Sequence, residues 1–395
     1  MSAALGLDLA LTAIGAPLCA AAGYLLGSTL LWARLPEPVP GPLRRRFRFV
    51  VPAHNESAGI AETVKSLRAV DYPADLFEVV VVADNCSDDT AARAREAGAT
   101  VVERHDLEHR GKGYALDHVF AATPAEVDAV VVIDADTLVS PNILRAFAAR
   151  RDLGAVAVQA DYAVRNPDAG WRTRLIAIAF GSFHIVRSRA RERLKLSCGL
   201  RGNGMCFSTA LLREVPHRAY SVVEDVEYGL RLGEAGHRVH YADEAHVYGE
   251  MVTTSAAANS QRRRWEEGRR ELIKQHAWRL LKAGLSRRDR VLLDLSLDLL
   301  IPPLSRVAVG VLGGAFAGCA LLVLGAPGIS AVVYGASTGA VILYVLRGWS
   351  VSRTGMRGLV DLGLAPVYVA WKATLRFRRP VRPTAEWVRT KREAP

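Results

Sequence analysis

Two long stretches without a single charged residue constrain this chain of 395 residues more than any other feature. The first runs from Leu9 to Ala33, and the second runs from Val307 to Leu346. Because a helix needs about 20 apolar residues to cross a bilayer, the first stretch predicts one membrane-spanning helix. The second is long enough for two, with a break at residues 325–328. The sequence therefore predicts a multi-pass membrane protein.

The N-terminal stretch could also be a cleaved signal peptide. Such a peptide normally begins with basic residues, whereas residues 1–33 contain no lysine or arginine and include Asp8. We therefore interpret residues 1–34 as an uncleaved transmembrane anchor. The other predicted segments outside the central domain are a proline-rich linker over 35–46, an interfacial helix over 281–306, two transmembrane helices over 307–346, and an interfacial or re-entrant segment with a basic tail over 347–395.

The formal net charge of +11 could indicate a nucleic-acid partner, but the placement of the basic residues favours a membrane. Arginines gather over 44–48, after the first apolar stretch, and again after Leu346. Basic residues beside membrane segments mark the cytoplasmic side and can bind anionic headgroups. We therefore expect membrane lipid and no nucleic acid as a partner. The protein is expected in the cell membrane, with the N-terminus outside and the central domain in the cytoplasm.

The segment between the apolar stretches alternates between strand and helix patterns. Such alternation predicts an α/β domain over 47–280, with a Rossmann-like, mostly parallel sheet and helices on both faces. Ligands of such sheets bind beyond the carboxyl ends of the strands. The predicted strands cover 47–52, 77–83, 100–103 and 129–133, and the predicted helices between them cover 60–70 and 90–97.

A further helix is predicted from Trp171 to Leu196, with a basic stripe made of the arginines at 187, 189, 191 and 193. The stripe could face solvent or contact anionic lipid headgroups. The interfacial helix carries Asp294 and Asp298 on one face, four residues apart. These two carboxylates argue against a full membrane span there.

Two acids follow the last of the predicted strands. Asp134 and Asp136 form a D-x-D directly after the apolar run that ends at Ile133. Hard ions such as Mg²⁺ or Mn²⁺ take oxygen ligands, usually one or two carboxylates together with substrate phosphates. Taken alone, the two residues could equally be ordinary turn carboxylates.

Three further motifs have both a structural and a chemical interpretation. Glu224 and Asp225 stand where a helix is expected to begin, either as acids that complement the helix dipole or as a general base. The sequence 202–204, Gly-Asn-Gly, allows the backbone to approach a ligand closely. An arginine and a tryptophan at 264 and 265 could face solvent, or could pair with a phosphate and stack on a sugar ring.

Taken in order, these motifs resemble the series D, DxD, ED and QxxRW of the inverting GT-A glycosyltransferases of family 2. The resemblance is to the membrane branch that includes the cellulose, hyaluronan and poly-N-acetylglucosamine synthases, and it runs from about Phe49 to Arg270. It implies a GT-A domain with N- and C-terminal transmembrane helices. It also implies Mg²⁺ or Mn²⁺ as cofactor and a nucleotide-sugar donor, which we expect to be UDP-linked.

The resemblance implies roles for individual residues. Asp225 matches the catalytic base of the family, and Asp136 and Asp134 match its metal ligands. The positions that match contacts to the nucleotide sugar are Ala53, Glu56, Asp84, Lys112 and Asp134. The positions that match contacts to the acceptor or the diphosphate are Gly202, Asn203, Gly204, Glu224, Gln261, Arg264 and Trp265.

Three functions are compatible with the resemblance. The first is inverting transfer to a growing polysaccharide at the membrane, with formation of a β-glycosidic bond. The second is a single transfer to a membrane lipid. The third, a non-catalytic sugar-nucleotide sensor, would be expected to lack an acid or the Arg–Trp pair, and all of these residues are present. The sequence therefore favours the polysaccharide synthase, with the lipid transferase as the alternative.

Overall fold

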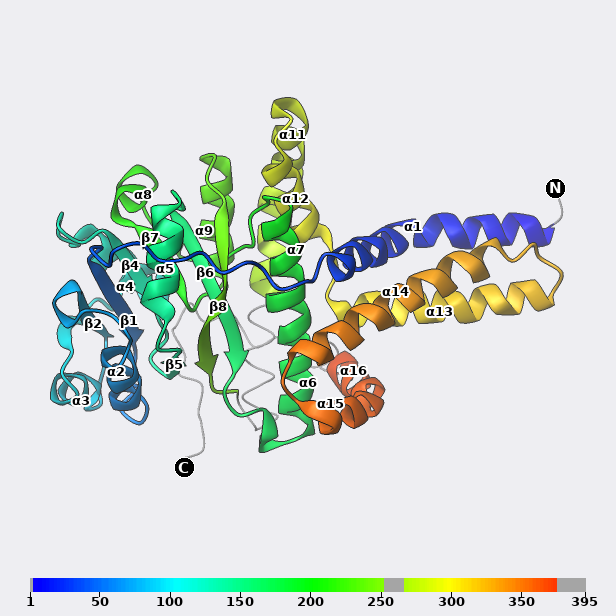
Figure 1. Ribbon diagram of the computed structural model, residues 1–395. Helices are drawn as coiled ribbons and strands as arrows, with labels where there is room; N and C mark the ends of the chain where they lie inside the picture. The colour runs from blue at the N-terminus through cyan, green and yellow to red at the C-terminus, as the bar shows by residue number, and fades with distance from the viewer. Residues whose placement is uncertain (1–2, 252–265, 375–395) are drawn as a thin grey trace.

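Three long apolar helices project from one side of an α/β domain in the computed structural model, which describes residues 3–251 and 266–374 (Figure 1). They are α1 (Ala3–Leu30), α13 (Leu304–Val323) and α14 (Ile329–Val351). Each is long and apolar enough to cross a membrane. The expected arrangement of one N-terminal and two C-terminal apolar helices is therefore confirmed.

A buried carboxylate connects α1 to α14 at the end of the bundle far from the α/β domain. Asp8 of α1 accepts hydrogen bonds from the backbone amides of Ile329 and Ser330, at 2.9 and 3.0 Å. These amides belong to the first turn of α14, where no intrahelical acceptor is available. Asp8 thus caps a neighbouring helix, which explains the place of an acid in an otherwise apolar segment.

A mixed sheet of eight strands forms the centre of the domain in the described residues, in the order β3-β2-β1-β4-β7-β6-β8-β5. The first four of these are mutually parallel, as are β6 and β8, whereas β7 and β5 run antiparallel to their neighbours. The predicted mostly parallel α/β fold is therefore confirmed. The strands are β1 (Phe47–Ala53), β2 (Phe77–Asp84), β3 (Thr100–Arg104), β4 (Ala129–Val132), β5 (Thr137–Val139), β6 (Ala157–Val164), β7 (Met205–Ser208) and β8 (Val239–Gly249).

Helices cover both faces of the sheet because successive side chains of a strand point to opposite sides. Phe49 and Val51 of β1 pack into the core formed with α2, α3 and α5, whereas Val50 packs into the core on the α4, α8 and α9 side. The predicted helices after β1 and β2 are confirmed as α2 and α3. The bounds are α2 (Ile60–Arg68), α3 (Thr90–Glu96), α4 (Lys112–Ala121), α5 (Ile143–Asp152), α8 (Thr209–Glu214) and α9 (Glu224–Glu234), with short 3₁₀ turns at Ala74–Leu76 and Pro167–Ala169.

One long helix separates the sheet from the projecting bundle (Figure 1). It consists of α6 (Trp171–Phe180), a π-helical segment η3 (Gly181–Val186) and α7 (Arg187–Arg193), and this agrees with the helix predicted there. Both α6 and η3 pack against α14, and α7 packs against α1. The remaining named elements are the π-helical turn η4 (Ile273–Ala277), α11 (Trp278–Arg287), α12 (Arg290–Leu300), α15 (Gly355–Asp361), the 3₁₀ turn η5 (Leu362–Leu364) and α16 (Ala365–Thr374).

Two arginines of the predicted basic stripe, Arg187 and Arg191, lie neither in solvent nor beside lipid headgroups. Arg187 and Arg191 are 5% and 1% exposed, and so they face neither solvent nor lipid headgroups. Arg191 Nε donates to Asp294 Oδ2 at 2.7 Å, and Arg187 forms an ion pair with Asp298. The two acids of α12 therefore point at α7. Helical periodicity alone does not distinguish a solvated charged face from one that is buried against opposite charges.

Candidate active site

The polar residues that follow β1, β2 and β4 meet at one edge of the sheet. His54 Nδ1 lies 2.8 Å from the backbone oxygen of Asp84, which joins the ends of β1 and β2. A Cβ atom placed on Gly59 would lie 3.8 Å from the Cα of Asp136, so the loop after β1 lies against the D-x-D. Because the strands are parallel, their carboxyl ends share this edge, where ligands of such sheets bind.

Lys112, the first residue of α4, connects three of the predicted site segments. Its Nζ lies 2.6 Å from Asp134 Oδ1, donates to the backbone oxygen of Gly202 at 2.5 Å, and lies 3.6 Å from Glu224 Oε1. Burial disfavours the charged ammonium, but the carboxylates of Asp134 and Glu224 outweigh this and raise the pKa of Lys112. The lysine is therefore a fixed positive charge at the centre of the cluster.

The loop at 202–204 adopts the backbone geometry that its glycines allow. Gly202 and Gly204 have φ values of +76° and +70°, in a region of backbone conformation that residues other than glycine rarely adopt. Asn203 between them is fully buried; its Oδ1 accepts from the Asp134 amide at 3.2 Å, and its Nδ2 donates to Thr137 Oγ1 at 2.8 Å. Asn203 thus locks the loop onto the turn that carries the D-x-D.

The two acids at the start of α9 border the same loop. A Cβ atom on Gly202 would lie 3.4 Å from Asp225 Oδ2 and 3.6 Å from Lys112 Nζ. Burial raises the pKa of Asp225, although the amide of Val226 and the charges of Lys112 and Arg201 oppose the rise. Burial likewise raises the pKa of Glu224, to about 7. Two neighbouring carboxyl groups with raised proton affinity suit proton transfer near neutral pH.

We expect Glu224→Gln to remove part of the pH dependence of stability. Because burial raises the pKa of Glu224 from 4.5 to about 7, the native state binds more protons than the unfolded state in this window. The stabilisation is fully present below pH 4.5 and is lost as the pH rises through 7. The free energy of unfolding of the variant should therefore fall less between pH 4.5 and pH 7 than that of the wild type, with a difference on the order of 2 kcal/mol. Denaturant unfolding at several pH values checks this. If the free energy of unfolding changed equally with pH in the two proteins, the prediction would be wrong.

Asp84 lies deeper in the same edge of the sheet. It is 1% exposed, and its Oδ1 accepts from Arg104 Nη1 at 2.6 Å. Its Oδ2 has no hydrogen-bond partner among the described residues. Arg104 also donates to Asp106 Oδ2 at 2.9 Å and so holds the loop after β3 against Asp84. A buried carboxylate oxygen without a donor is a place where a ligand's N–H or O–H group would be stabilised.

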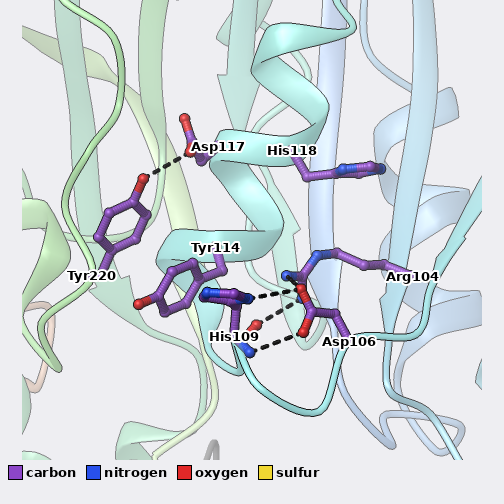
Figure 2. Close-up of a pocket in the computed structure, with 7 residues that line it drawn as sticks. All are labelled: Arg104, Asp106, His109, Tyr114, Asp117, His118 and Tyr220. Atoms are coloured by element: carbon purple, nitrogen blue, oxygen red, sulfur yellow. Dashed lines mark hydrogen bonds and ion pairs between the residues drawn. The ribbon is translucent and has the colours of Figure 1, made fainter.

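An open pocket of about 520 Å³ begins beside Arg104 (Figure 2). Tyr114 of α4 stacks on Tyr220, with 4.2 Å between the ring centroids and 9° between the planes. The Tyr220 hydroxyl donates to Asp117 Oδ2 at 2.8 Å. The pocket is therefore polar and aromatic, and Arg104 connects it to Asp84. Its lining residues are Arg104, Asp106, His109, Tyr114, Asp117, His118 and Tyr220.

The D-x-D provides oxygen donors but not a complete metal cage. Asp134 is bound by Lys112, and Asp136 Oδ1 accepts from Thr137 Oγ1 at 3.3 Å. Among the described residues, no group of three or more histidine, cysteine or acidic side chains could hold a metal ion. This donor set fits Mg²⁺ or Mn²⁺ only when substrate phosphates supply further ligands.

The structure brings most of the predicted site residues together. Lys112 contacts residues of three other motifs directly, and Ala53, Glu56 and Asp84 lie at or just after the neighbouring strand ends. The predicted Gln261, Arg264 and Trp265 lie outside the described residues. The sequence interpretation missed Arg201, whose charge acts on Asp225. It also missed Tyr162, a half-buried residue of β6 whose phenol pKa is raised by desolvation and by the charges of Asp134 and Asp225, and which no motif marks.

Two curated proteins show what this chain is similar to. A β-monoglucosyldiacylglycerol synthase of Synechocystis sp. is 32% identical over 234 residues, which cover 55% of this chain and 47% of that protein. A poly-β-1,6-N-acetyl-D-glucosamine synthase of Staphylococcus epidermidis is 22% identical over 245 residues, covering 59% and 57%. The chain thus spans about half the length of these curated relatives.

One solved structure resembles nearly the whole chain. It is a mannosyltransferase of Pyrobaculum calidifontis in complex with GDP-mannose and Mn²⁺, with a TM-score of 0.53 and 20% identity. The likeness covers 87% of this chain and 97% of that chain. At this identity it establishes a shared GT-A-like fold.

A family model supplies the assignment. The family described as "Glycosyltransferase like family 2" matches residues 44–268, which is more than half of the chain. The matched range includes the strand ends, Lys112, the D-x-D, the 202–204 loop and the acids of α9. This chain therefore belongs to glycosyltransferase family 2.

Proposed function

We propose that this protein transfers a hexose, with inversion, from a UDP-linked nucleotide sugar to a hydroxyl group of an acceptor at the membrane. One observation carries the proposal: Lys112 binds Asp134 at 2.6 Å and the Gly202 carbonyl at 2.5 Å, and Gly202 borders Asp225. The proposed donor-binding acid and the proposed base therefore belong to a single cluster. The bundle of apolar helices supports the membrane location. We propose from the placement of the basic residues that the catalytic domain faces the cytoplasm.

Asp225 acts as the general base in this proposal. Its carboxylate takes the proton of the acceptor hydroxyl while the hydroxyl oxygen bonds to the anomeric carbon. The bond from that carbon to the diphosphate oxygen breaks on the opposite face, and so an α-linked donor gives a β-linked product through an oxocarbenium-like state. The raised pKa of Asp225 makes it a stronger base than an exposed aspartate.

The other charged residues of the cluster bind the donor in this scheme. Lys112 holds Asp134 in place and adds positive charge beside the leaving group. Asp134 and Asp136 would hold Mg²⁺ or Mn²⁺, which neutralises diphosphate charge when it is bound. Asp84 is proposed to contact the nucleotide, and its link to Arg104, which lines the 520 Å³ pocket, supports this. Gln261, Arg264 and Trp265 are proposed to contact the diphosphate and the acceptor.

Two acceptors remain as candidates. The motif series favours elongation of a polysaccharide, as expected from the synthase branch. A single transfer to a membrane lipid is favoured by the comparisons, because the relative named for a glycolipid product is 32% identical and the relative named for a polymer is 22% identical. Product size distinguishes them, since elongation gives a ladder of products and lipid glycosylation gives one lipid-soluble species.

A donor screen tests the proposed reaction. We expect the purified full-length protein to release nucleotide from one of UDP-glucose, UDP-N-acetylglucosamine, UDP-galactose and GDP-mannose in the presence of membrane lipid. Chelation with EDTA should abolish release, and Mn²⁺ or Mg²⁺ should restore it, because the D-x-D alone does not complete a metal site. Absence of release from all four donors would contradict the proposed transfer, and release from GDP-mannose alone would contradict the UDP-linked donor. Mass spectrometry of the product identifies the acceptor.

A further inference from the structure

The long helix that separates the sheet from the bundle changes its geometry where it meets the apolar helix α14. Its π-helical segment η3 lies between α6 and α7, and α14 packs against it (Figure 1). The contact is close, because a Cβ atom placed on Gly181 would lie 2.5 Å from the backbone oxygen of Gly348. The same segment also packs against β6 of the sheet. Short π-helical segments are rare and occur frequently at functional sites, and this one joins α14 to the sheet.

Tyr344 of α14 stabilises the backbone of η3. Its hydroxyl donates to the backbone oxygen of Ser182 at 2.8 Å, and both residues are buried. The same oxygen accepts from the backbone amide of Arg187, five positions along the chain, which is the hydrogen bond typical of a π-helix. A side chain of α14 therefore helps to fix the turn that contains Phe183, the residue after Ser182.

The ring of Phe183 lies under the guanidinium group of Arg201. The Cζ atom of Arg201 is 4.1 Å from the ring centroid, which is a cation–π contact. Arg201 Nη2 also donates to the backbone oxygen of Cys198 at 2.9 Å. The backbone amide of Arg201 donates to Oε1 of Gln159, a buried residue of β6, at 2.9 Å. Neighbouring elements therefore hold both the side chain and the backbone of Arg201.

Arg201 directly precedes the 202–204 loop of the candidate site. The Gly202 carbonyl accepts from Lys112 Nζ, and a Cβ atom placed on Gly202 would lie 3.4 Å from Asp225 Oδ2. Burial raises the pKa of Asp225, and the charges of Lys112 and Arg201 oppose that rise. Arg201 is therefore connected to the proposed base through the backbone of the loop and through its charge.

We propose that Tyr344, Phe183 and Arg201 are positioning residues that hold the 202–204 loop and Asp225 in the arrangement required for transfer. The inference rests on the proposed glycosyl transfer. It adds α14, a helix long and apolar enough to cross a membrane, to the elements that form the active site. The three residues act through the backbone of the loop and through charge.

Other contacts hold the donor side of the site. Asp84 Oδ1 accepts from Arg104 Nη1 at 2.6 Å, and Asp136 Oδ1 accepts from Thr137 Oγ1 at 3.3 Å. Neither acid takes part in the series of contacts from Tyr344 to the 202–204 loop. Loss of a positioning residue should therefore lower the rate of transfer without a matching loss of UDP affinity.

Two variants with matched controls test the proposal in the full-length protein, using the donor that the screen identifies. Phe183→Leu removes the ring under Arg201, and we expect the single-turnover rate of transfer to fall by roughly tenfold. Phe183→Tyr, which keeps the ring, should retain the rate that Phe183→Leu loses. Tyr344→Phe removes the hydroxyl that donates to η3, and the rate should fall by about threefold to tenfold. Tyr334→Phe removes a hydroxyl of the same helix that donates to the Leu11 backbone oxygen at 3.1 Å, and its rate should equal that of the wild type.

Hydrogen exchange gives a readout that does not depend on turnover. With UDP and Mn²⁺ present, the backbone amides of residues 199–206 should exchange faster in Phe183→Leu and Tyr344→Phe than in the wild type, and Tyr334→Phe should leave them unchanged. Unchanged transfer rates together with unchanged exchange in Phe183→Leu and Tyr344→Phe would overturn the proposal. So would an equal loss of rate in Tyr334→Phe, or a loss of UDP affinity as large as the loss of rate, since either indicates a general structural role. If no donor supports transfer, the proposed function fails, and the exchange of residues 199–206 still decides whether these contacts hold the loop.

Discussion

Asp225→Asn is expected to lower the rate of sugar transfer by about 10²–10⁴-fold while UDP binding stays close to that of the wild type. Asparagine has nearly the shape of aspartate, but it does not take the proton of the acceptor hydroxyl. The carboxyl group borders the Gly202 loop at the centre of the cluster. Single-turnover measurements and UDP titration check the two halves of the prediction.

A matched control lies on the same helix. Glu234, at the other end of α9, pairs with Arg279 at the surface, 2.6 Å away. Glu234→Gln removes a carboxylate from α9 without touching the cluster, and its turnover should equal that of the wild type. Full turnover by Asp225→Asn would remove the base assignment, whereas loss of UDP binding would indicate a structural role for Asp225.

Asp298→Leu is expected to lower the free energy of unfolding by about 3–5 kcal/mol, because it leaves the buried Arg187 without its counter-charge and removes one of the two acids beside Arg191. Asp298 pairs with Arg187 and lies 3.3 Å from Arg191, and both arginines are buried. Burial opposes ionisation of Asp298, but the charges of these arginines outweigh it and lower the pKa of the carboxyl group. The pair joins α12 to the helix that supports the bundle, so its loss should loosen the domain from the apolar helices.

The double variant Arg187→Leu/Asp298→Leu separates the charge effect from lost packing. Leucine at 187 would retain apolar contact with the Phe183 ring, over which the guanidinium now lies at 4.6 Å. Removal of both charges should therefore cost less than removal of Asp298 alone. Asp168→Leu, at a side chain that is 80% exposed, should change stability by no more than about 0.5 kcal/mol. Thermal and denaturant unfolding in detergent provide the comparison, and a loss below about 1 kcal/mol for Asp298→Leu would contradict the prediction.

Three of the four strands that the sequence predicts are buried on both faces, and the fourth, β3, is a partly exposed edge strand. β1, β2 and β4 contain continuous apolar runs at 49–53, 79–83 and 129–132, because helices cover both sides of the parallel half of the sheet. The second half of the sheet was not predicted. β5 has three residues and β7 has four, which is too short for a clear pattern, and β8 partly alternates between buried and half-buried positions.

The sequence predicted the individual motifs of the candidate site but not the contacts between them. Asp134, Asp136 and the Gly-Asn-Gly loop could be recognised because strand ends and glycines have local signatures. Lys112 was placed near the donor through resemblance alone, and its bonds to Asp134 and Gly202 come from segments about 20 and 90 positions away. No local pattern encodes such a contact, since it depends on how α4 packs on the sheet.

By itself, the sequence determined the number of apolar helices, the α/β character of the domain and the order of the site motifs. Each of these is written in local periodicity, in the length of an apolar run or in residues close together in the chain. Only the tertiary structure decided that the arginines of α7 are buried against Asp298 and Asp294, and that Tyr344 of α14 donates to the π-helical segment beside Arg201. Burial and charge pairing depend on which surfaces meet in space, and residues more than a hundred positions apart provide those surfaces.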